Sequence, residues 1–365
     1  MATVYCGVDF HARKQTVSYL TTEDGEIKQT ELAHELEKVR GFYAELCQAG
    51  QVIVGFESSG YAAWFEEMLE ALGCEIWVGH AGQIRKCAHR RQKNDRRDAD
   101  LILELMLRGD FPRLHRYSRE SREVLQQLRY RQRLVKMRTM TINSLRFMTV
   151  SRGVTLRGKL QSRRGQARLL ALALPSPLDQ QRNELCRLLL ELQQKIEAVE
   201  KCLAETAALD QRVQLLRTHP GIGPLTSLCL AATLEQIERF ANSRKVTAYV
   251  GLDPVEDSSG ERRRIGSISK QGSRLLRLLL NEAGQVAARH DQELGRVYRR
   301  LLVRRGHATA KVAVARHLLV RAFIMLRDQI DYAEFCRRGV AARSSRAERL
   351  GSTAVKQIHS AMPVS

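Results

Sequence analysis

The stretch QVIVGFESSGYAAWFEEMLEALGCEIWVG, residues 51–79, decides the fold of the N-terminal part of the chain. It begins with an apolar run at 51–56, continues with apolar residues at helical spacing over 61–72, and ends with a second apolar run at 74–79. Gly73 suits the end of the helix between them. Strand, helix and strand in succession predict a buried sheet with helices packed on it, which is an α/β fold.

The same alternation extends to both sides of this stretch. Residues 3–9 (TVYCGVD) predict a strand that ends at the carboxylate of Asp9, and residues 15–20 alternate as its hairpin partner would. Residues 31–48 and 95–108 have the apolar period of amphipathic helices. We therefore expect one α/β domain over residues 1–115.

Beyond residue 115 the strand signal fades. Residues 119–150 predict one long Arg-rich helix, and a second compact region runs from about 219 to 336. Between them, six apolar residues recur at spacings of 4, 3, 4, 3 and 4, which is a heptad seam: Leu185, Leu189, Leu192, Ile196, Val199 and Leu203. The seam predicts a coiled coil, within the chain or between chains, or equally an ordinary bundle helix. We expect a helical linker over 116–214, a mostly α-helical domain over 215–338 and a mobile tail over 339–365.

Composition narrows the class of protein. The chain has 365 residues with 60 Lys and Arg against 40 Asp and Glu, a net charge of +20 that attracts polyanions, of which nucleic acid is the usual one. No apolar run is long enough for a membrane span, and the N-terminus lacks the apolar region of a secretory signal. The eight cysteines are scattered without a CxxC pair, which argues against a zinc ribbon or a disulfide scaffold. These features indicate a cytoplasmic protein.

The charge is unevenly distributed along the chain. Residues 1–80 hold 5 Lys and Arg against 13 Asp and Glu, whereas residues 81–150 hold 18 against 7. An acidic lobe followed by a basic segment suits an enzyme whose carboxylates hold divalent cations and whose arginines hold phosphates.

Four acidic residues are the candidates for such a cation site. Asp9 and Glu57 each end a predicted strand, so their carboxylates meet if the two strands are neighbours. Asp95 and Asp98 are three residues apart at the start of a predicted helix and share a face. Four convergent carboxylates would repel one another unless Mg²⁺ ions neutralised them. The alternative is that the strand-end acids are solvated, that Asp95 is an N-cap and that Asp98 complements the helix dipole.

Two neighbouring residues are weaker candidates. Asp100 is a rival ligand, but it points away from the face that Asp95 and Asp98 share. His11 lies close to Asp9 in the sequence and could contact a substrate. A histidine exposed at the surface without such a role is the more common case.

Three motifs carry a family resemblance in this half of the chain. GVDFHA at 7–12, GFESSG at 55–60 and KNDRRDAD at 93–100 resemble the N-terminal half of the DEDD transposases, insertion-sequence recombinases related to the Piv invertase. The resemblance implies a RuvC-like domain of the RNase H type, in which four acidic residues chelate Mg²⁺. The matching positions are Asp9, Glu57, Asp95 and Asp98.

The second half carries two further motifs. THPGIGPLTS at 218–227 has the Pro-Gly-x-Gly shape of a helix-hairpin-helix turn, where glycines allow the backbone to approach a phosphate. A loop dense in Ser, Gly and Arg then leads to a helix over 249–280, and residues 261–280 hold six Lys and Arg against one Glu. A hydroxyl flanked by guanidiniums suits phosphate chemistry, because the guanidiniums stabilise the negative charge of the phosphate.

This block resembles the C-terminal domain of the same family. In that family a serine of an SG element is the nucleophile and forms a covalent phosphoserine with DNA. Ser259 is the match because it directly precedes Gly260, and Ser258 is the runner-up. The resemblance also implies a structured non-coding bridge RNA that selects donor and target DNA by base pairing. We further expect a homodimer or homotetramer whose active site combines the carboxylates with the serine.

Arginines follow the acidic cluster along the chain and recur near its end. The first set is Arg113, Arg116, Arg119, Arg122, Arg129, Arg131, Arg133 and Arg138, and the second is Arg296, Arg299, Arg300, Arg304 and Arg305. We expect too few acidic partners to pair most of the first set, which favours binding to the backbone of a duplex over a solvated helix face.

The residues together favour a Mg²⁺-dependent enzyme acting on nucleic acid. The resemblance implies a transposase that exchanges DNA strands through a serine–DNA intermediate, guided by a bridge RNA and associated with the bacterial nucleoid. Two alternatives stay open. One is a RuvC-like hydrolytic nuclease or Holliday junction resolvase, and the other is a non-catalytic nucleic-acid-binding protein.

Overall fold

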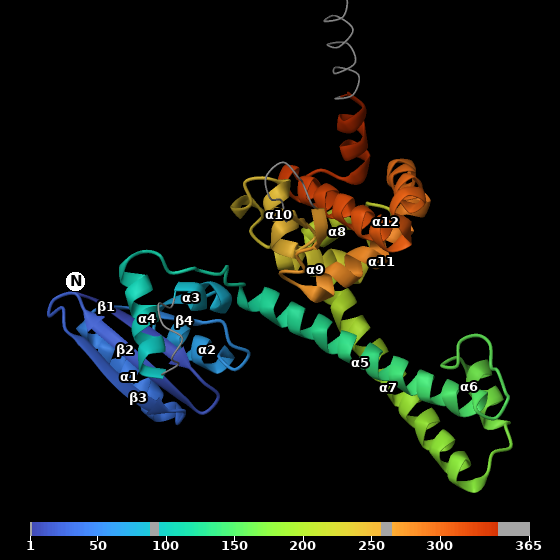
Figure 1. Ribbon diagram of the computed structural model, residues 1–365, viewed down its shortest axis with the longest axis horizontal. Helices are drawn as coiled ribbons and strands as arrows, with labels where there is room; N and C mark the ends of the chain where they lie inside the picture. The colour runs from blue at the N-terminus through green and yellow to red at the C-terminus, as the bar shows by residue number, and fades with distance from the viewer. Residues whose placement is uncertain (1, 88–94, 257–264, 342–365) are drawn as a thin grey trace, which may run out of the picture. The chain divides into compact units, whose positions relative to one another are not determined.

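The protein is described by a computed structural model that covers residues 2–87, 95–256 and 265–341, with the side chains of Asp95 and Ile265 left out (Figure 1). The chain divides after Arg116 into two compact units, which are described separately. Among the helices in these ranges, none is long and apolar enough to cross a membrane.

The N-terminal unit is built on a five-stranded mixed sheet in the order β3-β2-β1-β4-β5. Its strands are β1 (Thr3–Phe10), β2 (Lys14–Thr21), β3 (Ile27–Ala33), β4 (Gln51–Glu57) and β5 (Glu75–Gly79). β1, β2 and β3 form an antiparallel meander, whereas β1, β4 and β5 run parallel to one another. The predicted α/β class of this unit is confirmed.

Helices cover both faces of this sheet. They are α1 (Leu36–Ala49), α2 (Ala63–Ala71), α3 (Ala81–Cys87) and α4 (Asp95–Leu107). One core lies between the sheet and helices α1 and α2, where Phe56, Phe65 and Tyr43 are fully buried. The other lies beneath α3 and α4 and includes Ile53 and Ile102. Residues of one strand therefore alternate between two apolar layers, as expected of a strand that is buried on both faces.

One expectation for this unit is wrong. The helix expected over 31–48 begins only at Leu36, and the preceding residues 27–33 form β3. β3 lies at the edge of the sheet and its side chains are mostly exposed, so it lacks the apolar alternation that marks a half-buried strand.

The C-terminal unit is mostly helical. It contains α5 (Arg119–Val150), α6 (Arg163–Leu170), α7 (Ser176–Leu209), α8 (Gln211–Arg217), α9 (Pro224–Leu234), η1 (Ile237–Arg239), α10 (Ser243–Val250), α11 (Arg274–His290) and α12 (Gln292–Asp328), with a hairpin of β6 (Pro254–Glu256) and β7 (Ile265–Ile268). α12 is kinked at Gly306, and residues 332–341 form a further helical stretch. This helical stretch includes the first residues of the expected tail, 339–341, and the rest of that tail lies outside the described residues.

The heptad seam packs within the chain. In Figure 1, α5 and α7 run alongside each other with α6 near one end. Leu189 packs with Leu145 of α5, Leu192 and Ile196 pack with Leu134, and Leu203 joins the core that contains Leu125 and Leu128. The long Arg-rich helix has the predicted bounds, and its apolar face covers the seam of α7.

Candidate active site

The strand register brings two of the predicted acids to adjacent positions. β1 and β4 are parallel neighbours, paired from Thr3 with Gln51 up to Val8 with Phe56. Asp9 and Glu57 each follow this last pair by one residue. The carboxylates therefore leave the same end of two neighbouring strands.

Both acids also belong to the same face of the sheet. Val8 and Phe56 lie in the core beneath α1 and α2, whereas Tyr5 and Ile53 lie in the core beneath α4. Because side chains alternate along a strand, Asp9 and Glu57 share the α4 face with Tyr5 and Ile53. Asp9 is 14% exposed and Glu57 is 30% exposed.

Two glycines allow α4 to lie directly on this face. A Cβ on Gly7 would lie 2.4 Å from the backbone nitrogen of Leu103, and a Cβ on Gly55 would lie 2.2 Å from Sδ of Met106. Real Cβ contacts are never so short. Gly7 precedes Asp9 by two residues, and Gly55 precedes Glu57 by two. In each strand, a glycine that contacts α4 is therefore followed by an acid on the same face of the sheet.

The other two predicted acids lie on α4 itself. The sheet-facing side of this helix is formed by Ala99, Ile102, Leu103 and Met106, which are all buried. Asp98 lies one turn before Ile102 and is half-buried, and Asp95 is the first residue of the helix. The structure thus places Asp98 on the helix that covers Asp9 and Glu57, while the side chain of Asp95 is outside the described residues.

Asp100, the rival ligand, has a different role. Its Oδ1 accepts a hydrogen bond from Ser18 Oγ at 2.6 Å and another from Gln29 Nε2 at 3.1 Å. Asp98 and Asp100 are two residues apart and point to opposite flanks of α4. Asp100 therefore fastens the helix to β2 and β3.

Two basic side chains accompany the strand-end acids. His11 Nε2 lies 3.0 Å from Asp9 Oδ2, and the Arg85 guanidinium lies 3.9 Å from Glu57 Oε2. His11 was expected to be a surface residue or a substrate contact, and the structure places it against the Asp9 carboxylate. Sequence reasoning missed Arg85, because nothing in its neighbourhood indicated which acid it meets.

The donor set suits a hard divalent cation only in part. Asp9 and Glu57 supply carboxylate oxygens at one edge, which are the ligands that Mg²⁺ prefers. Among the described residues, however, no group of three or more acids, histidines or cysteines is close enough to hold a metal. The four-carboxylate cluster therefore remains a prediction, of which the structure shows the two strand-end members together.

In the C-terminal unit, the Pro-Gly-x-Gly motif forms the turn between α8 and α9. Gly221 has φ +96°, and a Cβ there would lie 2.5 Å from the backbone nitrogen of Ala287 in α11. A Cβ on Gly223 would meet nothing within 4 Å. The first glycine is thus required by packing inside the unit, and the second is at an open position that a phosphate backbone can approach.

A buried ionic cluster lies beside this turn. His219 is 1% exposed, its Nδ1 is 2.8 Å from the carbonyl oxygen of Pro220, and its Nε2 is 3.4 Å from Arg321 Nη1. Arg321 also donates to Asp291 at 2.6 Å. Burial lowers the pKa of His219 to about 4, which keeps the ring neutral. Burial alone would raise the pKa of Asp291, but hydrogen bonds from Arg321, Leu294 and Tyr332 hold that pKa at about 2.

The hairpin that precedes α11 is held firmly at its base. Arg277 Nη1 donates to the carbonyl oxygens of Val250 at 3.0 Å and Gln271 at 2.7 Å, and Ser269 Oγ donates to Asp253 at 2.7 Å. Ser273 caps α11 by accepting from the nitrogen of Leu276. Ser269 thus ties the residue after β7 to Asp253, and Ser273 serves as the N-cap of α11.

The predicted nucleophile Ser259 and its alternative Ser258 belong to the segment between β6 and β7, residues 257–264, which lies outside the described residues.

Acidic partners are more numerous for the first arginine set than local sequence suggested. At least four of its eight members pair with carboxylates of the described residues: Arg113 with Glu75, Arg116 with Glu66 and Glu70, Arg119 with Glu123, and Arg131 with Glu200. Except for Glu123, these acids are distant in sequence, so local counting could not find them.

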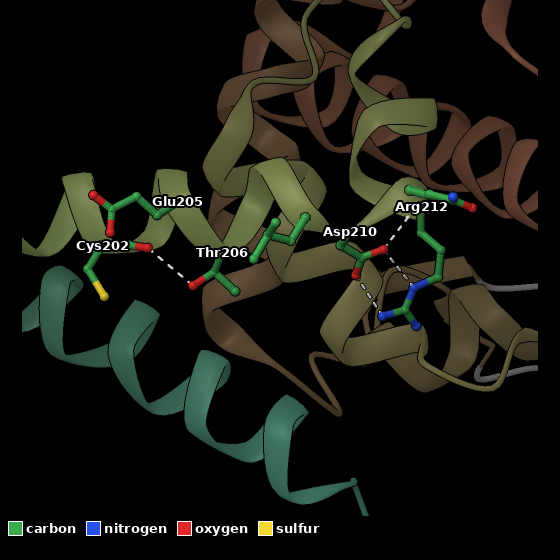
Figure 2. A pocket seen from close by; sticks show the side chains of 7 residues that line it. Cys202, Glu205, Thr206, Asp210 and Arg212 are labelled. Atoms are coloured by element: carbon green, nitrogen blue, oxygen red, sulfur yellow. Dashed lines mark hydrogen bonds and ion pairs between the residues drawn. The ribbon is translucent and has the colours of Figure 1, made fainter.

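A surface hollow with a volume of about 670 Å³ lies where α7 meets α8. Figure 2 shows the side chains that line it. Asp210 caps α8 by accepting from the nitrogen of Arg212 at 2.8 Å, and the Arg212 guanidinium returns to the same carboxylate at 2.7 Å. Thr206 Oγ donates to the carbonyl oxygen of Cys202. Asp210 and Arg212 thus satisfy each other, which indicates a structural role for this pair at the junction of α7 and α8.

Comparison with known proteins places this pair of units in the transposase class. A DEDD transposase model of the IS110 type, described as "Transposase", matches residues 6–149. A second family model, described as "Transposase IS116/IS110/IS902 family", matches residues 213–299. The two matches cover the strand-end acids and α4 in the first unit, and the Pro-Gly-x-Gly turn and the hairpin in the second.

Individual relatives agree with the family models. The chain is 30% identical over 262 residues to a "Probable family 20 transposase" of Pseudomonas aeruginosa, covering 69% of this chain and 75% of that protein. It is 32% identical over 231 residues to the "Transposase for insertion sequence element IS1111A" of Coxiella burnetii, covering 61% and 64%. It is 30% identical over 244 residues to the "Transposase for insertion sequence element IS1328" of Yersinia enterocolitica, covering 64% and 70%. The chain belongs to the IS116/IS110/IS902 family of transposases.

Proposed function

We propose that this protein is a DNA transposase that exchanges strands through a covalent serine–DNA intermediate. The observation that carries the proposal is the placement of Asp9 and Glu57 at adjacent strand ends beneath α4, in a chain of a transposase family. The mixed sheet with acids at neighbouring strand ends supports a RuvC-like assignment for the first unit. The family relationship supports DNA as the substrate.

In this proposal, Asp9, Glu57, Asp95 and Asp98 would hold Mg²⁺. The bound ion would neutralise part of the charge that develops on the reacting phosphodiester. Within the chain, the contact from His11 fixes the Asp9 carboxylate, and Asp100 fixes α4 through Ser18. His11 and Asp100 are thus positioning residues, separate from the four proposed Mg²⁺ ligands.

Ser259 is the proposed nucleophile. Its Oγ forms a bond to the phosphorus as the bond from phosphorus to one deoxyribose oxygen breaks. The hydroxyl proton passes to a base, and the departing oxygen takes up a proton. Because one phosphodiester replaces another, the hydroxyl of a second DNA strand can reverse the step and join the strands. Serine is a weak nucleophile without a base, so we expect the reaction to need groups from the first unit.

Base pairing by a bridge RNA, and a dimer or tetramer that combines the two kinds of residue, complete the proposal. Purified protein should recombine DNA poorly without this RNA, and efficient recombination in its absence would contradict that part.

The test is a strand-exchange assay with Ser259→Ala, Ser258→Ala and Asp9→Asn. We expect Ser259→Ala and Asp9→Asn each to reduce exchange on the order of 10³-fold while DNA binding is retained, and Ser258→Ala to have a small effect. Normal exchange by Ser259→Ala would remove this serine from the mechanism. Cleavage that persists without a protein–DNA adduct would favour the hydrolytic nuclease or junction resolvase. Unchanged function in Asp9→Asn would favour a non-catalytic binding protein.

A further inference from the structure

A groove of about 370 Å³ lies between α5 and the start of α11. Its walls combine cationic, amide, hydroxyl and leucine side chains. They are Arg129, Gln132, Arg133 and Lys136 of α5, with Ser273, Arg274, Leu275 and Leu278 at or near the start of α11. The α5 cations occur at i, i+4 and i+7, so one face of the helix presents all three.

The cations of this groove differ from those on the other side of α5. Arg131 pairs with Glu200 of α7 at 2.5 Å, and Arg138 donates to Gln193 of α7 at 2.9 Å. By contrast, neither Arg129, Arg133 or Lys136 nor Arg274 has an acidic partner among the residues that the structure describes. One set of α5 cations thus contacts α7 within the unit, and another set lines the groove.

The groove lies at the base of the hairpin that leads to α11. Gly251 and Gly272 both have positive φ, and a Cβ on Gly251 would lie 1.9 Å from the carbonyl oxygen of Gln271. This close contact joins the end of α10 to the residues before Arg274. β6 and β7, whose connecting segment contains the proposed nucleophile, therefore arise next to the groove.

We propose that this groove binds the phosphate backbone of the DNA strand that reaches the hairpin, an inference that rests on the proposed function. From Arg129 to Lys136 the helix rises about 10 Å, which corresponds to about three phosphates of one strand at roughly 3.4 Å of axis each. The cations supply the complementary charge, and Leu275 and Leu278 offer apolar contact to sugars. Contacts of this kind position DNA without reading its sequence.

The test is the salt dependence of binding to a 30-base-pair DNA duplex carrying the end of the element. The groove variant combines Arg129→Gln, Arg133→Gln and Lys136→Gln. The matched control combines Arg327→Gln, Arg337→Gln and Arg338→Gln, which removes the same charge from ion-paired positions of the same unit. Each lost phosphate contact lowers the slope of log K against log salt by about 0.9.

We expect the groove variant to lose about 2 to 3 from this slope and the control to lose less than 1, with equal thermal unfolding midpoints. Single Arg133→Gln should lose about 1. Equal losses in the two triple variants, or no loss in the groove variant, would overturn the proposal. A loss seen with a duplex RNA of the same sequence but not with DNA would overturn the choice of DNA.

A failure of the groove is distinguishable from a failure of the proposed function. Binding slopes require no chemistry, so they are measured on the Ser259→Ala background as well. If strand exchange survives Ser259→Ala, the serine mechanism is wrong. The groove proposal is tested separately, by the slope of log K against log salt for DNA binding.

Discussion

The two units of this chain differ most in charge. Residues 1–116 hold 15 Lys and Arg against 18 Asp and Glu, whereas residues 117–365 hold 45 against 22. The first unit places acids at the ends of parallel strands beneath a helix, and the second presents cations along helices. Such a division suits a reaction in which one unit binds cations and the other binds a polyanion.

The units also differ in how they position their functional groups. In the first, Gly7 and Gly55 allow α4 to lie directly on the sheet, so backbone packing determines where the acids are. In the second, cations project from helices whose opposite faces are packed. The acids therefore should tolerate little change, whereas single cations should be replaceable.

The largest expected difference is between two aspartates of α4. We expect Asp98→Asn to reduce strand exchange on the order of 10²-fold, because a proposed metal ligand loses its charge. Asp100→Asn should retain at least half of the activity, because an amide oxygen still accepts from Ser18. Strand-exchange rates at saturating Mg²⁺ measure both. Equal losses would indicate that the helix, and not the Asp98 carboxylate, is what matters.

The two glycines of the Pro-Gly-x-Gly turn provide the next comparison. Gly221→Ala should destabilise the second unit by about 3 kcal/mol, because φ +96° strains an alanine and its Cβ meets the backbone of α11. Gly223→Ala has open space and should change stability by less than about 1 kcal/mol. Denaturant unfolding measures both. An unaltered stability in Gly221→Ala, with weaker DNA binding, would show that this glycine serves a phosphate instead of packing.

The last comparison concerns the buried histidine of the second unit. The pKa of His219 is about 4 in the folded protein and near 6.5 when unfolded, so the unfolded state binds more protons between these values. Its contribution to stability is therefore complete above pH 6.5 and is lost as the pH falls towards 4, by up to roughly 3 kcal/mol. Other titrating groups reduce the net change.

His219→Gln isolates this contribution. The variant should have a shallower dependence of unfolding free energy on pH between 6.5 and 4 than the original protein. Parallel pH profiles for the two proteins would show that His219 does not titrate as its burial requires.

The sequence was sufficient for features that depend on local pattern. The bounds of α5 follow from its unbroken helical composition, and Asp9 and Glu57 were found because a short apolar run ends at each. The parallel pairing of β1 with β4, which makes these acids neighbours, is a long-range property that the residues alone only suggested. β3 was missed because an exposed edge strand lacks the apolar alternation of a buried one.

Features that depend on distant partners could not be predicted. The heptad seam of α7 was equally compatible with a partner chain, and only the fold shows that α5 covers it. The acids that neutralise Arg116 and Arg131 lie 46 to 69 positions away in the sequence. For the same reason, the difference between paired and groove-facing cations of α5 became visible only in the structure.

The most direct test of the account is to trap the reaction on element-end DNA and identify the attached peptide by mass spectrometry. The account predicts a DNA adduct on Ser259 that forms with Mg²⁺ in the original protein and is absent in Asp9→Asn. An adduct on another residue, or an equally abundant adduct in Asp9→Asn, would contradict the claim that the acids of the first unit serve the serine of the second.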